Sequence, residues 1–152
     1  MDVSVAGQDD LGQLASLLWL HAAPDEQARQ PIEPFRADFA NWWSNHAGTH
    51  IAFVARPAES EIVGMAWLAL VPRVPRPGTT TRLSADIQSV FVRLEQRGQG
   101  IGSALISAAS DRARQLGAER VTVHSGRKAI PLYESLGFTS SQQLLQRSQG
   151  RP

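Results

Sequence analysis

Three glycines at alternate positions, Gly98, Gly100 and Gly102, are the first feature of this sequence that could do chemistry. Glycine lets consecutive main-chain N–H groups turn outward with no Cβ in the way, and the start of a helix attracts anions. Such a run is an anion cradle, best suited to a phosphate or pyrophosphate group. It fits neither common nucleotide motif, because it lacks the Lys-Ser/Thr pair of a P-loop and is one residue short of G-x-G-x-x-G.

The segments on either side of these glycines predict a strand that runs into a helix. Residues 85–92 are rich in β-branched and aromatic side chains, which is typical of a strand. Apolar residues then recur at helical spacing from Ile101 to Leu116, and Gly117 ends the pattern. The cradle therefore lies at a strand–turn–helix junction. A glycine-rich turn that merely begins a helix is the plainer alternative.

A second strand and a short helix follow along the chain. Residues 118–124 predict the strand, because Val121 and Val123 fall on one face. The helix carries Tyr133, which is the only tyrosine in the 152 residues. Pro131 is tolerated in its first turn, where the missing N–H has no partner to lose.

Together, these segments resemble the GNAT superfamily of acyl-CoA-dependent N-acetyltransferases. The loop Arg97-Gly98-Gln99-Gly100-Ile101-Gly102 is similar to the family's Arg/Gln-x-x-Gly-x-Gly/Ala pyrophosphate loop. Leu132-Tyr133-Glu134-Ser135-Leu136-Gly137-Phe138 is similar to its Leu-Tyr-x-x-x-Gly-Phe motif. The pattern alone predicts an α/β or α+β domain. The resemblance implies the GNAT-like fold, a central mixed sheet flanked by helices.

The resemblance also implies a site for acetyl-CoA as co-substrate. Its pantetheine arm is expected in a gap between two splayed strands, against the main chain of Val90, Phe91 and Val92. Arg97 would add charge beside the pyrophosphate. The amides that would hold the pyrophosphate belong to Gly98, Gln99, Gly100, Ile101, Gly102 and Ser103.

One position departs from the family pattern. Many relatives carry a cofactor-binding asparagine seven residues before the motif tyrosine, where this chain has Gly126. The neighbouring Ser125 is the candidate to replace that contact through its hydroxyl.

Acetyl transfer to an amine needs a proton donor for the leaving thiolate, and the resemblance places it at Tyr133. A phenol of pKa near 10 donates to a thiolate mainly by hydrogen bonding. A tyrosine that only packs in the core is the alternative.

The transfer also needs a base, because an alkylammonium must lose a proton before it attacks. Asp86 is the candidate, because it is the titratable residue on the strand before the loop. Strand alternation predicts that Asp86 and Gln88 share a face with Val90 and Val92. His124 and His21 are further candidates.

An aromatic stripe on an earlier predicted helix has two interpretations. Phe35, Phe39, Trp42 and Trp43 either bury against the sheet or line part of an acceptor pocket. Three arginines in a proline-rich loop, Arg73, Arg76 and Arg82, are expected to form a solvated rim, with an anion contact as the alternative.

The whole chain predicts a single domain over residues 1–147, with a frayed tail at 148–152. The expected element order is β-α-α-β-β-β-α-β-α-β. The expected boundaries are strand 2–6, helix 9–22, loop 25–33, a helix from Pro34 to Gly48, an antiparallel hairpin of 50–56 and 62–71, loop 72–84, and a final strand over 139–146.

Composition excludes several function classes. The formal net charge is +1, which favours neither nucleic acid nor a membrane as partner. The chain has no cysteine, so a cysteinyl acyl-enzyme is excluded, which supports direct attack by the acceptor amine in a ternary complex. Its histidines show no ligand-pair spacing, so no metal is expected. No secretory or membrane-spanning pattern is present, which predicts a cytoplasmic protein.

The predicted activity is transfer of an acetyl group from acetyl-CoA to a primary amine, on a small molecule or a protein. A homodimer is common in the family. A non-catalytic acyl-CoA-binding sensor of the same fold is the main alternative, and a nucleotide-binding α/β protein of another class is the second.

Overall fold

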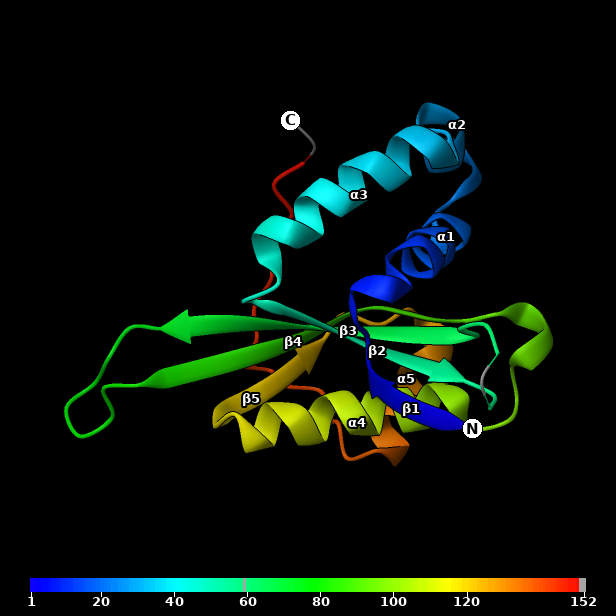
Figure 1. The fold of residues 1–152 in the computed structure, drawn as a ribbon. Coiled ribbons are helices and arrows are strands. Elements are labelled where there is room, and N and C mark those ends of the chain that lie inside the picture. Colours follow the sequence, from blue (N-terminus) through cyan, green and yellow to red (C-terminus); the bar gives the residue numbers. More distant parts are fainter. Residues whose placement is uncertain (59, 151–152) are drawn as a thin grey trace.

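A five-stranded mixed sheet runs through the middle of the computed structural model, which describes residues 1–58 and 60–150 (Figure 1). The strands lie in chain order across the sheet, and β1 to β4 are antiparallel neighbours whereas β4 and β5 are parallel. The expected mixed sheet is therefore confirmed. The strands are β1 (Asp2–Val5), β2 (His50–Arg56), β3 (Gly64–Arg73), β4 (Arg82–Val92) and β5 (Ala118–Val123).

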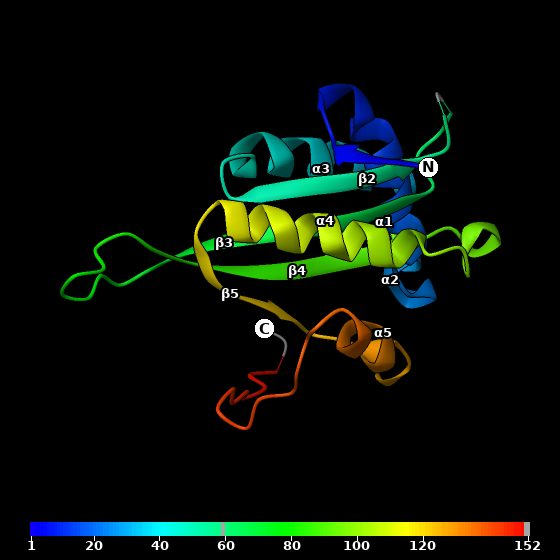
Figure 2. The same ribbon diagram turned by 90° about the horizontal axis from the view of Figure 1, so that it is seen from below.

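Helices cover both faces of this sheet. In Figure 1, α1, α2 and α3 lie above the sheet and α4 lies below it, with α5 beside β5 as Figure 2 shows. The helices are α1 (Leu11–His21), α2 (Pro24–Arg29), α3 (Ile32–His46), α4 (Ile101–Gln115) and α5 (Ile130–Ser135). In the described ranges, no helix is long and apolar enough to cross a membrane.

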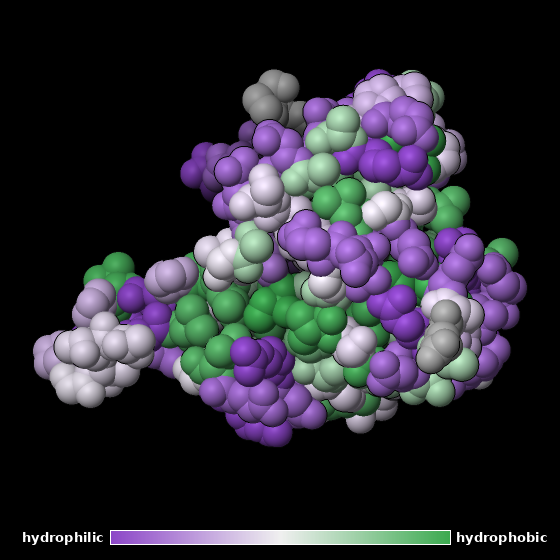
Figure 3. Space-filling view, viewed as in Figure 1, coloured by the Kyte–Doolittle hydropathy of each residue, from purple (hydrophilic) through white to green (hydrophobic). Residues whose placement is uncertain are grey.

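The sheet separates two hydrophobic clusters, and strand alternation decides which side chain joins which. In β2, Ala52 and Val54 belong to the cluster under α1 and α3, whereas Phe53 and Ala55 belong to the cluster under α4. Because both faces are covered, β2 and β3 read as continuous apolar runs. Hydrophobic residues accordingly show at the level of the sheet, between more hydrophilic helical surfaces (Figure 3).

Helix α4 packs closely on the sheet because β3 begins with a glycine. A Cβ added at Gly64 would lie 3.0 Å from Leu105 and 3.3 Å from Ile101, both on α4. Gly64 therefore fixes how near the start of α4, and with it the glycine loop, lies to the strands.

The expected loop at 25–33 is wrong in part, because residues 24–29 form the short helix α2. Its signals are local: Pro24 occupies the first turn, and the Glu26 carboxylate accepts a hydrogen bond from the Ala23 amide at 3.0 Å. Helix α3 also begins two residues before Pro34, at Ile32.

The expected final strand over 139–146 is wrong. Within the described part of the chain, this segment forms a turn and irregular backbone, and β5 pairs only with β4. Leu144 and Leu145 are exposed, so the segment has no apolar face that pairing would bury. Of the predicted tail, residues 148–150 are irregular and 151–152 lie outside the described residues, as does Glu59 in the β2–β3 turn.

The expected solvated rim of arginines is wrong at Arg82. Strands β3 and β4 extend into the predicted 72–84 loop, and Arg82 is only 8% exposed. Its guanidinium donates to both carboxylate oxygens of Glu119, at 2.8 and 3.2 Å, and to the carbonyl oxygen of Val74 at 2.7 Å. Arg82 thus ties the start of β4 to β5.

Candidate functional site

The glycine loop presents a row of free main-chain donors at the start of α4. Within the described residues, the six amides from Gly98 to Ser103 donate to no acceptor, and the first helical bond runs from Ala104 N to Gly100 O at 3.1 Å. Gly98 and Gly100 have φ values of +77° and +81°, which glycine adopts without strain. This arrangement fits the diphosphate of coenzyme A, because free N–H groups and a helix start both favour a bound anion.

The Arg97 side chain turns back onto β4 at the entrance of this loop. Its Nε donates to the Val92 carbonyl oxygen at 2.9 Å, and its guanidinium carbon lies 5.6 Å from the centroid of the Phe91 ring. Arg97 therefore joins the loop to the end of the strand that precedes it. The charge it adds beside a phosphate stays a prediction.

Strands β4 and β5 part beside the loop. Their pairing ends at Ile87 and Val123, whereas β4 continues to Val92. Figure 2 shows β5 diverging from β4 on the way to α5. The edge of β4 from Val90 to Val92 is therefore unpaired on the β5 side, where the pantetheine arm is expected.

A β-bulge interrupts β4 just before this unpaired edge. Gln88 lies opposite Trp67 and Phe91 opposite Met65, so two residues of β4, Ser89 and Val90, oppose one residue of β3. Ser89 takes a positive φ of +51°.

The bulge overturns the expectation that Asp86 and Gln88 share a face with Val90 and Val92. Val90 and Val92 pack against the cluster under α4, as Ile87 does, whereas Phe91 packs under α1 and α3. One extra residue reverses the alternation along the strand. Asp86 and Gln88 consequently face α1 and α3.

The Asp86 carboxylate contacts Gln88 and Thr122 on this face. Its Oδ1 accepts a hydrogen bond from Thr122 Oγ1 at 2.9 Å, and its Oδ2 accepts one from Gln88 Nε2 at 3.1 Å. Asp86 is half-buried on the face of the sheet that α1 and α3 cover, and both of its carboxylate oxygens already accept hydrogen bonds.

Tyr133 on α5 is buried against the cluster under α4. It is 7% exposed and packs edge-on against Phe138, with ring centroids 5.5 Å apart. Burial raises the pKa of the Tyr133 phenol, so its protonated form persists beyond the usual range. In the described chain its hydroxyl makes no hydrogen bond. The neighbouring Leu132 lies 3.9 Å from a Cβ built at Gly102, so α5 packs against the loop.

Three further predicted residues are scattered. His124 is exposed just after β5, and the Ser125 hydroxyl donates to the carbonyl of Gly126 at 2.8 Å. His21, at the end of α1, lies 5.3 Å from the Phe91 ring. Burial, followed by the nearby charge of Arg97, lowers the pKa of His21.

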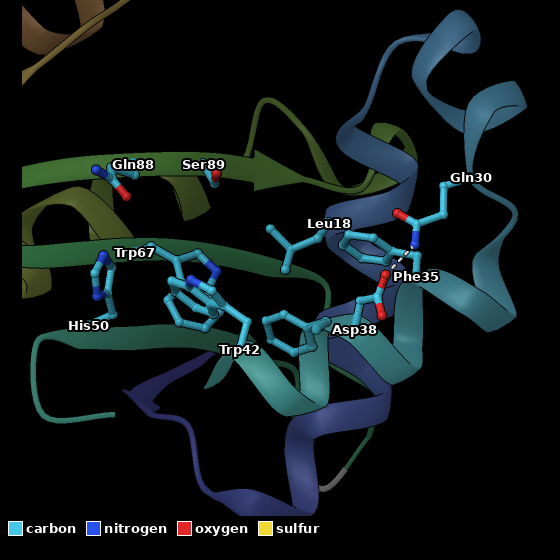
Figure 4. Close-up of a pocket in the computed structure, with 10 residues that line it drawn as sticks. Leu18, Gln30, Phe35, Asp38, Trp42, His50, Trp67, Gln88 and Ser89 are labelled. Carbon is cyan, nitrogen blue, oxygen red and sulfur yellow. Dashed lines mark hydrogen bonds between the residues drawn. The ribbon is translucent and has the colours of Figure 1, made fainter. Parts of the chain in front are cut away.

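A pocket of about 340 Å³ opens between the sheet and helices α1 and α3 (Figure 4). We call it the acceptor pocket, because Ser89 in its wall adjoins the unpaired edge of β4. Its lining comes from five elements and one connector: Leu18, Gln30, Phe35, Asp38, Phe39, Trp42, His50, Trp67, Gln88 and Ser89.

The residues of the aromatic stripe divide between the core and a pocket, and whether that pocket takes the acceptor stays a prediction. Trp43 is buried and does not line the pocket, whereas Phe35 and Trp42 are half-buried and do. Phe39 does both.

Sequence reasoning missed Asp38 and His50 in this pocket. His50 is the first residue of β2. Because side chains two positions apart share a face of a strand, His50 lies on the same face as Ala52 and Val54, which α1 and α3 cover. Asp38 lies one helical turn after Phe35, which is a usable signal as well.

Tyr133 and the acceptor pocket are not brought together directly. Tyr133 lines a second cavity, of about 640 Å³, on the outer side of β5, where the expected final strand would lie. The unpaired edge of β4 lies between the core around Tyr133 and the pocket, since Val90 and Val92 pack on one side and Ser89 lines the other. In the described ranges, no three His, Asp or Glu side chains converge as metal ligands.

Comparison with known proteins identifies the class. The profile of the acetyltransferase (GNAT) family matches residues 14–138. The chain belongs to this family of acetyltransferases, which confirms the resemblance seen in its two motifs.

Individual relatives agree with this assignment. A curated glucosamine 6-phosphate N-acetyltransferase of Trypanosoma brucei brucei is 39% identical over 77 residues, which are 51% of this chain and 50% of that protein. The chain spans half or less of the length of the curated relatives it matches.

Solved structures confirm the fold. A crystal structure of a Trypanosoma brucei acetyltransferase is 27% identical, with a TM-score of 0.76 and coverage of 97% of this chain and 98% of that one. A structure described as a predicted acetyltransferase with acetyl-CoA, from Clostridium acetobutylicum, has a TM-score of 0.75 at 15% identity and coverage of 97% and 95%.

Proposed function

We propose that this protein transfers the acetyl group of acetyl-CoA to a primary amine, which attacks directly in a ternary complex. The observation that carries the proposal is the row of six free amides from Gly98 to Ser103, next to the unpaired edge of β4. These groups give the two parts of coenzyme A, a charged diphosphate and an amide-bearing arm, adjacent main-chain partners. A curated relative named as a glucosamine 6-phosphate N-acetyltransferase supports an amine acceptor.

Each predicted contact has a place in this scheme. The amides of the loop would hold the diphosphate, and the main chain of Val90, Phe91 and Val92 would bind the pantetheine amides. Arg97 would lie at the strand end between the two, and Ser125 would be reached only if its hydroxyl leaves the Gly126 carbonyl.

Acetyl transfer needs a proton acceptor for the amine and a donor for the leaving sulfur, and the candidates lie on opposite sides of β4. The amine nitrogen forms a bond to the acetyl carbon while the carbon–sulfur bond breaks, so the sulfur leaves as a thiolate and the nitrogen loses a proton. Tyr133 would stabilise the leaving sulfur mainly by a hydrogen bond from its phenol, which the raised pKa keeps protonated, and the thiolate then takes its proton from solvent. Asp86 would take the proton from the ammonium through water beside Gln88.

Thiol release tests the proposal. Acetyl-CoA is mixed with the protein and a panel of primary amines, and free thiol is followed together with the mass of the acetylated amine. We expect release that requires both substrates, and an Asp86→Asn variant with a lower kcat. Tight binding of coenzyme A without turnover of any amine would instead support an acyl-CoA sensor.

A further inference from the structure

The acceptor pocket has an unusual balance of rings and charges. Four aromatic side chains, Phe35, Phe39, Trp42 and Trp67, line a space of about 340 Å³. Asp38 is the acidic side chain in the lining, and none of the lining residues in the described chain is a lysine or arginine. A bound molecule therefore meets apolar faces, a single negative charge and the uncharged polar groups of Gln30, Gln88 and Ser89.

The rings are arranged to hold a flat apolar body. Phe39 meets Trp67 edge-on at 5.9 Å, and Trp42 meets Trp67 at 5.9 Å with an interplanar angle of 68°. Rings set at steep angles offer both faces and edges, which are the two surfaces that an aromatic guest or an alkylammonium prefers. Trp42 is half-buried, and the His46 ring stacks on it at 4.7 Å, so a guest can contact the part of its surface that stays exposed.

One buried donor in the wall has no partner. Trp67 is 3% exposed, and its indole Nε1 makes no hydrogen bond in the described chain. Buried N–H groups are almost always paired, because an unpaired one loses the hydrogen bond it made with water. This nitrogen is shielded from the pocket as well as from solvent, so Trp67 offers a bound molecule the apolar surface of its indole ring.

The charge of the pocket disfavours an anionic molecule. Asp38 is held in place by Gln30, whose Nε2 donates to its Oδ2 at 2.7 Å, and Figure 4 shows the two side chains together at the helical end. His50 lies at the opposite end (Figure 4). Burial, together with the nearby His46, lowers the pKa of His50, so its ring is neutral near pH 7. A phosphate would find no counter-charge here.

We propose that the acceptor is a primary amine on a flat aromatic body, with no phosphate or carboxylate group. This inference rests on the proposed function. The proposed acceptor differs from that of the curated relative, which is named for a phosphorylated amino sugar.

Four probe amines test the substrate class: tyramine, 2-phenylethylamine, glucosamine and glucosamine 6-phosphate. We expect the kcat/KM of thiol release to be higher for the two aromatic amines than for glucosamine and lowest for glucosamine 6-phosphate. Tyramine should be at least tenfold above glucosamine, on the order of one well-filled apolar contact. A higher kcat/KM for glucosamine 6-phosphate than for tyramine overturns the inference while leaving the acetyltransferase proposal intact.

Variants of Trp42 test the position of the body. Trp42→Ala should raise the KM for tyramine about tenfold, as loss of an aromatic contact does, and leave the KM for acetyl-CoA unchanged. Trp42→Phe should restore most of the affinity. Asp38→Asn should weaken tyramine roughly threefold, because a solvent-exposed charge contributes little. An unchanged KM for tyramine in Trp42→Ala contradicts the inference.

A binding measurement distinguishes the two proposals if no amine is turned over. Tyramine binding is followed by quenching of tryptophan fluorescence, with glucosamine 6-phosphate as the matched control. Quenching by tyramine alone would support the ligand class although the transferase proposal had failed. Quenching by neither amine would overturn both.

Discussion

The cofactor loop presents main-chain groups, whereas the acceptor pocket presents side chains. The loop is one continuous stretch, Gly98 to Ser103, and it offers main-chain N–H groups. The pocket draws side chains from α1, α3, β2, β3 and β4, and it offers rings and one carboxylate. The bulge at Ser89 and Val90 links the pocket to the unpaired edge of β4, since Ser89 lines the pocket and Val90 begins the edge.

This difference teaches where specificity can change. A main-chain site needs only the right backbone conformation, so it accepts the same diphosphate whatever side chains surround it. A side-chain pocket changes its preference with each residue that lines it. The chain and a relative named for another acceptor can therefore share the first site and differ in the second.

The largest expected effect separates two adjacent tryptophans. Trp43→Ala should lower the free energy of unfolding by about 3–5 kcal/mol, because it empties a buried site in the core. Trp42→Ala should cost less than half as much, since Trp42 faces the pocket and is half-exposed. Urea unfolding followed by circular dichroism measures both. Equal losses would mean that Trp42 is a core residue and not a pocket wall.

Tyr133→Phe should lower kcat about 100-fold and change neither KM, because it removes a proton donor and nothing else. Its packing against Phe138 is kept, and the hydroxyl has no partner to lose in the described chain, so the melting temperature should stay the same. Burial raises the pKa of Tyr133, so the wild-type rate should fall on the alkaline side only above the usual tyrosine range. A variant with wild-type kcat would assign Tyr133 to the core alone.

Two glycines of equal backbone strain test the cofactor loop. Gly100 and Gly117 have φ values of +81° and +85°, lie at the two ends of α4, and have open space where a Cβ would project. An alanine at either position should cost about 1 kcal/mol of stability. Only Gly100→Ala should raise the KM for acetyl-CoA, by roughly five- to tenfold, because the strain then distorts the amides that hold the diphosphate. Steady-state kinetics with Gly117→Ala as control decides this.

The smallest expected effect is on stability, at the end of the β4–β5 pair where Arg82 contacts Glu119, away from the unpaired edge of β4. The hydrogen bonds from Arg82 lower the pKa of the Glu119 carboxyl below its usual value. A lowered folded-state pKa stabilises the protein above the unfolded value near 4.5, and this contribution is lost as pH falls through the folded pKa. Glu119→Gln should therefore flatten the acid side of the stability profile measured by thermal unfolding. An unchanged profile would show that the pair does not hold the strands.

The local structure of the expected cofactor loop was predictable from the sequence. The strand, the glycines and the helix start are neighbours in the chain, so propensity and helix-start chemistry specify them locally. Tyr133 was identified from its motif for the same reason. Asp86 was placed on the wrong face, because the bulge at Ser89 is produced by pairing with β3 and leaves no sign in strand alternation.

The errors elsewhere have a shared cause. Arg82 looked like a surface residue until β5 brought Glu119 beside it, 37 positions along the chain. The segment 139–146 resembled a strand, but Leu144 and Leu145 found no partner surface to cover them in the described structure. Propensity describes what a segment can do, and packing decides whether it does so.

The sequence by itself determined the family, through its two motifs, and the glycine-rich turn from strand to helix, because these depend on residues adjacent in the chain. The tertiary structure alone decided the acceptor pocket. Phe35 and Trp67 stand 32 positions apart, and they share a wall only because α3 packs over β3. Burial of apolar surface drives that packing without regard to distance along the chain, so the ring-lined space it leaves is a property of the folded molecule.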